Sequence, residues 1–198
     1  KLPLGLLLIS PFSALAHPHA FIDMQTKPLV KDNQLIGFST QWLLDEASSS
    51  AVLYDVKQAK GDKAAQQKLV DEVMANVVNE HYFSYVFDKE NHKIKYTKHP
   101  EHYGMRVKGN EVEYYFDFLL AQPQALQNNE FTLMTYDRTY YVAMRYAETG
   151  KRAVDFSSLP ANCKGEVLEP NVYEKIQSYA SSLDKAQKNE DDSLGVLF

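Results

Sequence analysis

Apolar and polar residues alternate from Ala20 to Leu44, in a segment rich in Phe, Ile, Val and Thr. This period of two is typical of strands that bury one face. The polar triplet Lys31-Asp32-Asn33 divides the segment and predicts a tight turn. We therefore expect a β-hairpin between residues 20 and 44.

A period of three to four residues follows the hairpin. A short helix is expected from Ser50 to about Lys57. A longer helix is expected after Gly61, because the Asp62 side chain can cap its first turn. The apolar positions of this helix recur at helical spacing: Leu69, Val70, Val73, Met74, Val77 and Val78. The aromatic stretch that follows, Tyr82 to Phe87, either extends the helix or turns into a strand.

The second half of the chain returns to patterns typical of strands. A strand is expected from Val112 to Leu120, after a turn at Lys108-Gly109-Asn110, and a loop follows from Gln122 to Asn129. Two more strands, Phe131 to Tyr136 and Thr139 to Tyr146, are expected to pair with each other around a tight corner.

The last predicted element is an amphipathic helix from Val172 to Leu183. Strands and helices are mixed along the chain without a repeating β-α-β order. This pattern predicts a single α+β domain, in which a mostly antiparallel sheet packs against two or three helices.

Residues 1–16 have the pattern of a signal peptide. Leu2 to Ala16 is almost wholly apolar and ends in Ala14-Leu15-Ala16, which is typical of signal-peptidase cleavage. The stretch is too short to span a bilayer, and no other stretch reaches membrane length. We expect cleavage after Ala16 and a mature, exported domain of residues 17–198 that does not span the membrane.

Composition narrows the function further. The 21 basic and 26 acidic side chains do not suit nucleic-acid binding. Cys163 is the only cysteine, although an oxidising compartment permits disulfides, and the chain ends on the apolar run Gly195 to Phe198, so we expect a C-terminal truncation. Common catalytic motifs are missing from the sequence, and we expect a binding protein rather than an enzyme.

The predicted mature N-terminus is the strongest candidate for metal binding. In an extended strand, His17, His19 and Asp23 project to one face, close to the free amine of His17. Imidazoles with a carboxylate suit Zn²⁺, and Ni²⁺ or Cu²⁺ are also possible. Pro18 has no amide hydrogen, which excludes the usual amino-terminal chelate through a deprotonated backbone nitrogen. The alternative is that these histidines are only the solvated start of the mature chain.

Three sequence blocks strengthen the metal hypothesis. They are HPHAFID at residues 17–23, QWLLDEASSS at residues 41–50 and YDRTYYVAM at residues 136–144. In this order they resemble the ZevA-like family, which was long described as a periplasmic component of an ABC-type transport system. The resemblance implies an accessory protein for divalent-metal uptake, chiefly of zinc, that works with a NicO-type or ABC-type inner-membrane permease. In that role the metal is cargo and not a catalytic cofactor.

The resemblance adds three residues to the candidate site. Asp45 and Glu46 fall on the second block and Asp137 on the third. Two departures from the family pattern put a ligand in doubt, since Gln41 stands where many relatives have His and Arg138 where many have Pro. Many relatives also have a second cysteine beyond the end of this chain, which would supply a disulfide partner for the cysteine here.

Each added residue also has a structural alternative. Asp45 and Glu46 can stabilise the start of a helix, and Asp137 can organise its own turn. A second histidine-rich segment, His99-Pro100-Glu101-His102 with His92 upstream, is a weaker metal candidate. Two other functions stay open, a copper-binding N-terminal histidine brace with redox activity and a metal-independent scaffold.

Overall fold

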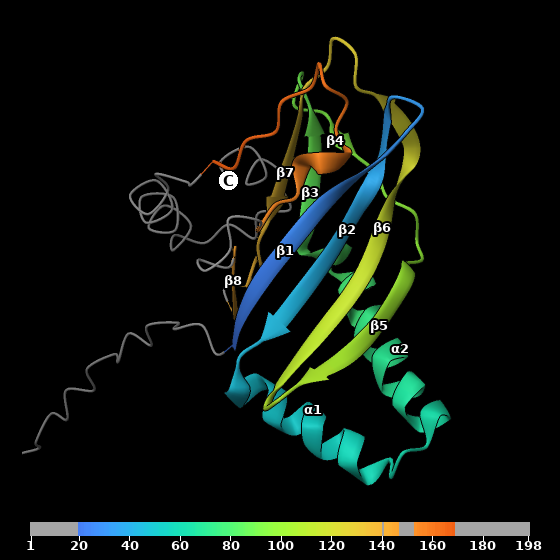
Figure 1. The fold of residues 1–198 in the computed structure, drawn as a ribbon, viewed down its shortest axis with the longest axis vertical. Helices are drawn as coiled ribbons and strands as arrows, with labels where there is room; N and C mark the ends of the chain where they lie inside the picture. The colour runs from blue at the N-terminus through green and yellow to red at the C-terminus, as the bar shows by residue number, and fades with distance from the viewer. Residues whose placement is uncertain (1–19, 140, 147–152, 169–198) are drawn as a thin grey trace, which may run out of the picture.

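The computed structural model of the chain describes residues 20–139, 141–146 and 153–168. The predicted signal peptide, His17, His19 and the helix expected at 172–183 lie outside the described residues. The larger of two sheets has the strand order β5-β6-β2-β1-β8 (Figure 1). Its strands are β1 (Ala20–Lys31), β2 (Gln34–Leu44), β5 (Glu101–Lys108), β6 (Glu111–Ala125) and β8 (Val142–Tyr146).

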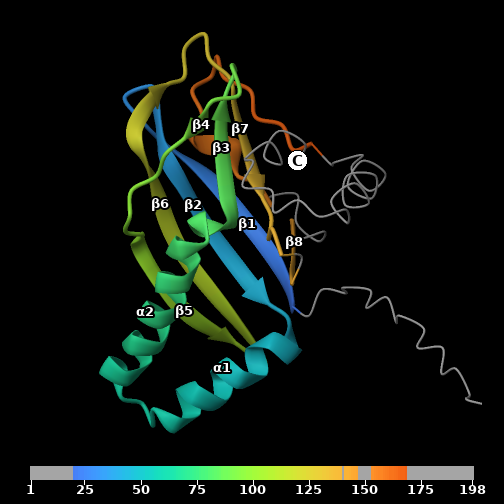
Figure 2. The same cartoon turned by 180° about the vertical axis from the view of Figure 1, so that it is seen from behind.

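The smaller sheet has the order β4-β3-β7. Its strands are β3 (Ser84–Asp88), β4 (Lys93–Ile94) and β7 (Phe131–Thr135). Seen from behind, this sheet and the second helix lie over one face of the larger sheet (Figure 2). Apart from the parallel pairing of β1 with β8, the strand pairs are antiparallel, so the predicted α+β domain with a mostly antiparallel sheet is confirmed.

The predicted hairpin is present as β1 and β2. Asp32 and Asn33 form its turn with positive φ values of 50° and 58°. Short polar residues tolerate this left-handed conformation, and a two-residue turn of this kind matches the twist of the paired strands. Along β1, Ile22 and Met24 are buried, whereas Phe21 is exposed and Asp23 is half-buried. The alternation predicted from the sequence therefore holds where β1 begins.

Two helices follow the hairpin. Helix α1 (Glu46–Gln58) begins four residues earlier than expected, because Asp45 caps it. Helix α2 (Lys63–Asn79) begins after Asp62, whose carboxylate accepts hydrogen bonds from the backbone of the first turn as predicted. None of the helices in the described residues combines the length and apolar character that a membrane crossing requires.

Residues 82–87 could extend the helix or form a strand, and a left-handed turn at their beginning decides for the strand. His81–Phe83 forms a short 3-10 turn in which φ takes positive values of 53°, 58° and 49°. This left-handed turn ends the helical course and leads directly into β3. His81 therefore lies beyond the end of α2.

Two expectations about the second half of the chain were wrong. β7 and β8 do not pair with each other: β7 pairs with β3, whereas β8 joins the larger sheet beside β1. β7 and β8 each lie at the edge of a different sheet. This pairing depends on strands far away in the sequence, so the short connection between β7 and β8 does not predict it. The expected loop at 122–129 is also partly strand, because β6 continues to Ala125 and stays paired with the beginning of β2.

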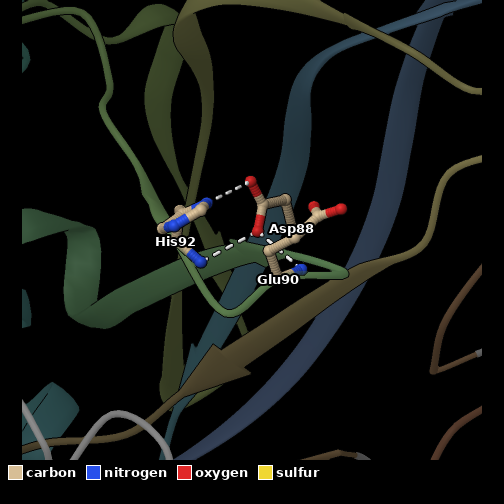
Figure 3. A group of neighbouring side chains, drawn as sticks. All are labelled: Asp88, Glu90 and His92. Atoms are coloured by element: carbon tan, nitrogen blue, oxygen red, sulfur yellow. Dashed lines mark hydrogen bonds and ion pairs between the residues drawn. The ribbon is translucent and has the colours of Figure 1, made fainter.

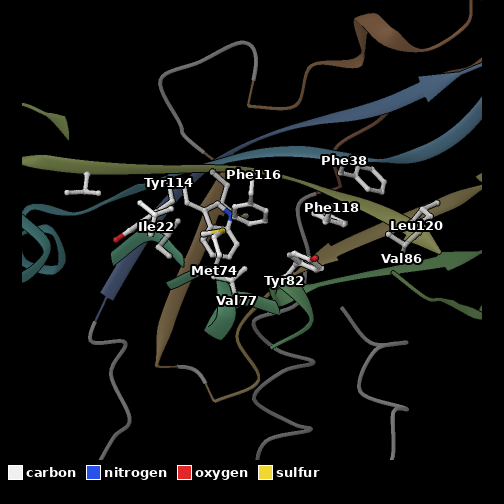
Figure 4. Packing of buried hydrophobic residues seen from close by; sticks show 14 of the residues in the cluster. Ile22, Phe38, Met74, Val77, Tyr82, Val86, Tyr114, Phe116, Phe118 and Leu120 are labelled. Atoms are coloured by element: carbon white, nitrogen blue, oxygen red, sulfur yellow. The ribbon is translucent and has the colours of Figure 1, made fainter. Parts of the chain in front are cut away.

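The core lies between the larger sheet and the elements that cover it (Figure 4). Trp42 on β2 packs edge-on against Phe116 on β6, with ring centroids 4.8 Å apart. Helix α2 and the smaller sheet contribute other members, and the most deeply buried residues of the cluster are Val86, Val112, Tyr82, Phe116, Phe118, Met24 and Met74. Burial of aromatic side chains on this scale contributes several kcal/mol each to folding. Packing in the core fixes the position of β1. His17 and His19 precede this strand in the sequence, and Asp23 lies near its beginning.

Candidate metal centre

Asp45 connects the start of β1 to the start of α1. Its Oδ2 accepts a hydrogen bond of 2.6 Å from the backbone N–H of Phe21, and its Oδ1 accepts one of 2.7 Å from the backbone N–H of Ser48. The Ser48 hydroxyl is a third donor at 3.1 Å. Partial burial works to raise the pKa of Asp45, but these hydrogen bonds outweigh it and the pKa lies below its ordinary value. The structural alternative weighed from the sequence, that Asp45 stabilises the start of a helix, is confirmed, because Asp45 caps α1.

Asp137 organises the turn between β7 and β8. Its side chain is 6% exposed, and it accepts bonds of 2.8 Å from both the N–H and the hydroxyl of Thr139. It also accepts a 2.9 Å bond from the N–H of Val142, the residue paired with Ala20 at the beginning of β1. Asp137 therefore fixes the strand that lies beside the first residues of β1.

The two remaining described candidates are more accessible. Asp23 lies on β1, and its Oδ1 is 2.5 Å from Nε of Arg145 on the neighbouring β8. Glu46 is exposed and occupies the first position of α1, where a carboxylate favours the positive end of the helix dipole. Asp23 faces away from the core, on the same side as Phe21.

The structure thus brings three of the predicted carboxylates to the beginning of β1. Asp45 binds the second residue of the strand, Asp23 is its fourth residue, and Asp137 holds the residue opposite its first. His19 immediately precedes this strand in the sequence, and His17 lies two residues further upstream. A carboxylate offers about four lone-pair positions. Asp45 and Asp137 use most of theirs on protein donors, so they suit orientation of a site better than direct coordination.

A different group of ligand atoms lies on the turn between β3 and β4 (Figure 3). Asp88, Glu90 and His92 place one ligand atom each within 4.8 Å of one another, and they form the one such triad within residues 20–139, 141–146 and 153–168. The sequence pattern pointed to His92 but not to Asp88 or Glu90. Their spacing of two residues, Asp-x-Glu-x-His, was the available signal, because a tight turn brings such positions together.

The other histidine-rich segment does not form a comparable group. Nδ1 of His102 lies 3.0 Å from Oδ2 of Asp117, and the His102 side chain is largely exposed. His99 instead lines a shallow cavity of about 310 Å³ against α2. Within the part of the chain that the structure describes, His99 and His102 belong to no triad of ligand atoms. Cys163 is half-buried and has a free thiol.

The fold is that of a single α+β domain, and its described residues gather three potential metal ligands on the turn between β3 and β4. Residues 2–198 match the family described as "Protein of unknown function (DUF1007)", and the chain belongs to this family. It is 62% identical over 198 residues to a Haemophilus influenzae protein described as "Uncharacterized protein". That match covers 100% of this chain and 94% of the relative. No solved structure matches this chain.

Proposed function

We propose that this chain is a periplasmic accessory protein that binds a divalent metal, chiefly Zn²⁺, and passes it to an inner-membrane permease. His17 and His19 are the proposed ligands, and Asp23 is the carboxylate best able to join them. The resemblance of the three sequence blocks to the ZevA-like family supports uptake as the purpose and a NicO-type or ABC-type permease as the partner. The metal is cargo in this proposal, and no catalytic role is assigned.

The observation that carries the proposal is the arrangement at the beginning of β1. Residues that are far apart in the sequence, Asp45 and Asp137, both fix the backbone of this short region. Asp23 faces the same side of the strand as its exposed neighbour Phe21. The sequence pattern predicts that His17 and His19 project to this side if the chain before Ala20 is also extended. A histidine pair attached to a firmly held strand loses less entropy on binding a metal than a pair on a free chain does.

If Asp23 binds the metal, its carboxylate has to give up its ion pair with Arg145. Its ion pair with Arg145 is partly exposed, with side-chain exposures of 34% for Asp23 and 56% for Arg145. Exposed ion pairs contribute only about 0 to 1 kcal/mol, so this exchange costs little compared with a metal–carboxylate bond.

The test is calorimetric titration of Zn²⁺, Ni²⁺ and Cu²⁺ into protein that begins at His17. A His17→Ala/His19→Ala double variant should lose the tight one-to-one Zn²⁺ binding. Asp23→Asn should weaken binding by about tenfold while the stoichiometry stays the same. His99→Ala is the matched control, since it removes an exposed imidazole elsewhere, and it should change nothing. Zinc binding that is the same in the double variant and the unaltered protein would overturn the proposal.

A further inference from the structure

The turn between β3 and β4 holds its three ligand residues in a single short segment. Asp88 ends β3, and Glu90 and His92 follow at intervals of two residues. The Asp88 side chain is 22% exposed and that of His92 is 78% exposed. The turn is therefore open to a solvated ion, while its carboxylate at the end of β3 is anchored to the fold.

Asp88 is oriented by the backbone of its own turn. Its Oδ1 accepts hydrogen bonds of 2.9 Å from the N–H of Glu90 and 2.8 Å from the N–H of His92. The backbone bond from His92, followed by that from Glu90, holds the pKa of Asp88 below its ordinary value against the opposing effect of partial burial. One carboxylate oxygen is thus committed to the turn, and Oδ2 is left facing the imidazole (Figure 3).

The separation between the imidazole and this second oxygen has the size that a metal ion requires. Nδ1 of His92 lies 3.3 Å from Oδ2 of Asp88. Zinc–nitrogen and zinc–oxygen bonds of about 2.0–2.2 Å with tetrahedral angles place neighbouring donor atoms roughly 3.3–3.5 Å apart. A proton shared between these two atoms and a zinc ion bound to both therefore need nearly the same arrangement of side chains.

Glu90 can supply a third ligand at small cost. In the structure its Oε1 lies 3.6 Å from Nζ of Lys89, in a pair whose two side chains are about half exposed, at 50% and 53%. Such a surface pair is weak and easily exchanged. One imidazole and two carboxylates form a donor set for borderline cations such as Zn²⁺, whereas Ca²⁺ prefers six to eight oxygen ligands.

We propose that Asp88, Glu90 and His92 form a second, weaker site for a borderline divalent cation, of which Zn²⁺ is the representative. The cation bridges Nδ1 of His92 and Oδ2 of Asp88, takes one oxygen of Glu90 and keeps water in its remaining position. Its open surroundings favour fast exchange, as is suitable for capturing an ion and releasing it again. This site is independent of His17 and His19 and does not rest on the proposed function.

The test uses the His17→Ala/His19→Ala double variant, in which the N-terminal histidines no longer compete for metal. Zn²⁺ is titrated while the histidine ring resonances are followed by NMR. We expect the resonances of His92 to shift and to saturate with a one-to-one stoichiometry, at lower zinc concentrations than those of His99. Adding His92→Ala should abolish the saturable binding. Asp88→Asn should weaken it at least tenfold, and this variant keeps an oxygen that can accept the two turn N–H bonds.

Lys89→Ala serves as a second control within the same turn. It removes the cation that competes for Glu90, so zinc should bind with equal or higher affinity. The proposal is overturned if the His92 resonances do not move at millimolar zinc, or if the same saturable binding persists after His92→Ala. Whether the double variant loses the tight N-terminal binding is a test of the proposed function. That result does not bear on the site at the β3–β4 turn.

Discussion

The beginning of β1 and the turn between β3 and β4 both have carboxylates near histidines in the sequence, but they use them differently. Asp45 accepts a bond from a backbone N–H 24 residues away, so it joins two separate elements. Among the residues that the structure describes, the donors to Asp88 all belong to its own turn, and one oxygen is left facing His92. A carboxylate occupied by distant backbone donors therefore positions a site, whereas one stabilised locally can still offer an oxygen to a metal.

The largest loss of stability is expected when Asp137 is replaced, because it is the most deeply buried of these carboxylates. Asp137→Ala leaves the N–H groups of Thr139 and Val142 without their acceptor in a region that is 6% exposed at Asp137. Thr139 is exposed and Val142 is half-buried, and a hydrogen bond to a charged group contributes about 1.5–3 kcal/mol, so we expect the free energy of unfolding to fall by about 1.5–3 kcal/mol. Urea unfolding followed by circular dichroism measures this change. A loss below about 0.5 kcal/mol would assign Asp137 to a role other than support.

A smaller effect is expected for Asp45, which caps α1. Loss of a capping side chain costs about 0.5–2 kcal/mol, and we expect Asp45→Ala to fall in this range. Because the folded pKa of Asp45 is lowered, its contribution to stability is complete above the unfolded value of about 3.9 and is lost as the pH falls through the folded pKa. Urea unfolding at neutral pH and near pH 3 should show the difference between the unaltered protein and Asp45→Ala shrinking in acid. A difference that stays constant with pH would contradict the capping account.

The number of protons released when zinc binds also distinguishes the beginning of β1 from the β3–β4 turn. Each imidazole must lose its proton before it can bind a metal. In acid, binding through the two imidazoles of the N-terminal pair should therefore release more protons per zinc than binding through a single imidazole on the β3–β4 turn. Calorimetry in buffers of different ionisation enthalpy counts these protons. Equal counts in the unaltered protein and in the His17→Ala/His19→Ala variant would remove the distinction between the two places.

The smallest effect is expected at Glu46, which is exposed at the first position of α1. Glu46→Gln removes a favourable interaction with the helix dipole, worth about 0.3–1 kcal/mol at most, and leaves the Asp45 cap intact. Thermal unfolding should shift by no more than a few degrees. A marked loss of zinc affinity in this variant would instead make Glu46 a ligand.

Local sequence patterns predicted the elements that local physics decides. The Asp32-Asn33 turn and the Asp62 cap depend on residues within a few positions of each other, and both are present as expected. The pairing of β7 and β8 was predicted wrongly, because the choice between neighbouring sheet edges depends on the assembled fold. Residue patterns show that a segment is a strand but not which edge it joins.

The same limit applies to the candidate sites. The dual possibilities for Asp45 and Asp137, ligand or structural support, were visible in the sequence, and only the structure shows the donors that each carboxylate satisfies. The triad on the β3–β4 turn was missed because Asp88 and Glu90 look like ordinary surface residues. Their ligand atoms converge only because the chain reverses within five residues.

X-ray absorption at the zinc edge, on protein that begins at His17 and is loaded with one equivalent of zinc, tests the central claim most directly. The account predicts two imidazole rings bound at about 2.0–2.1 Å, unchanged by His92→Ala and lost in the His17→Ala/His19→Ala variant. A shell with a single imidazole that disappears in His92→Ala would place the principal site on the β3–β4 turn and contradict the account.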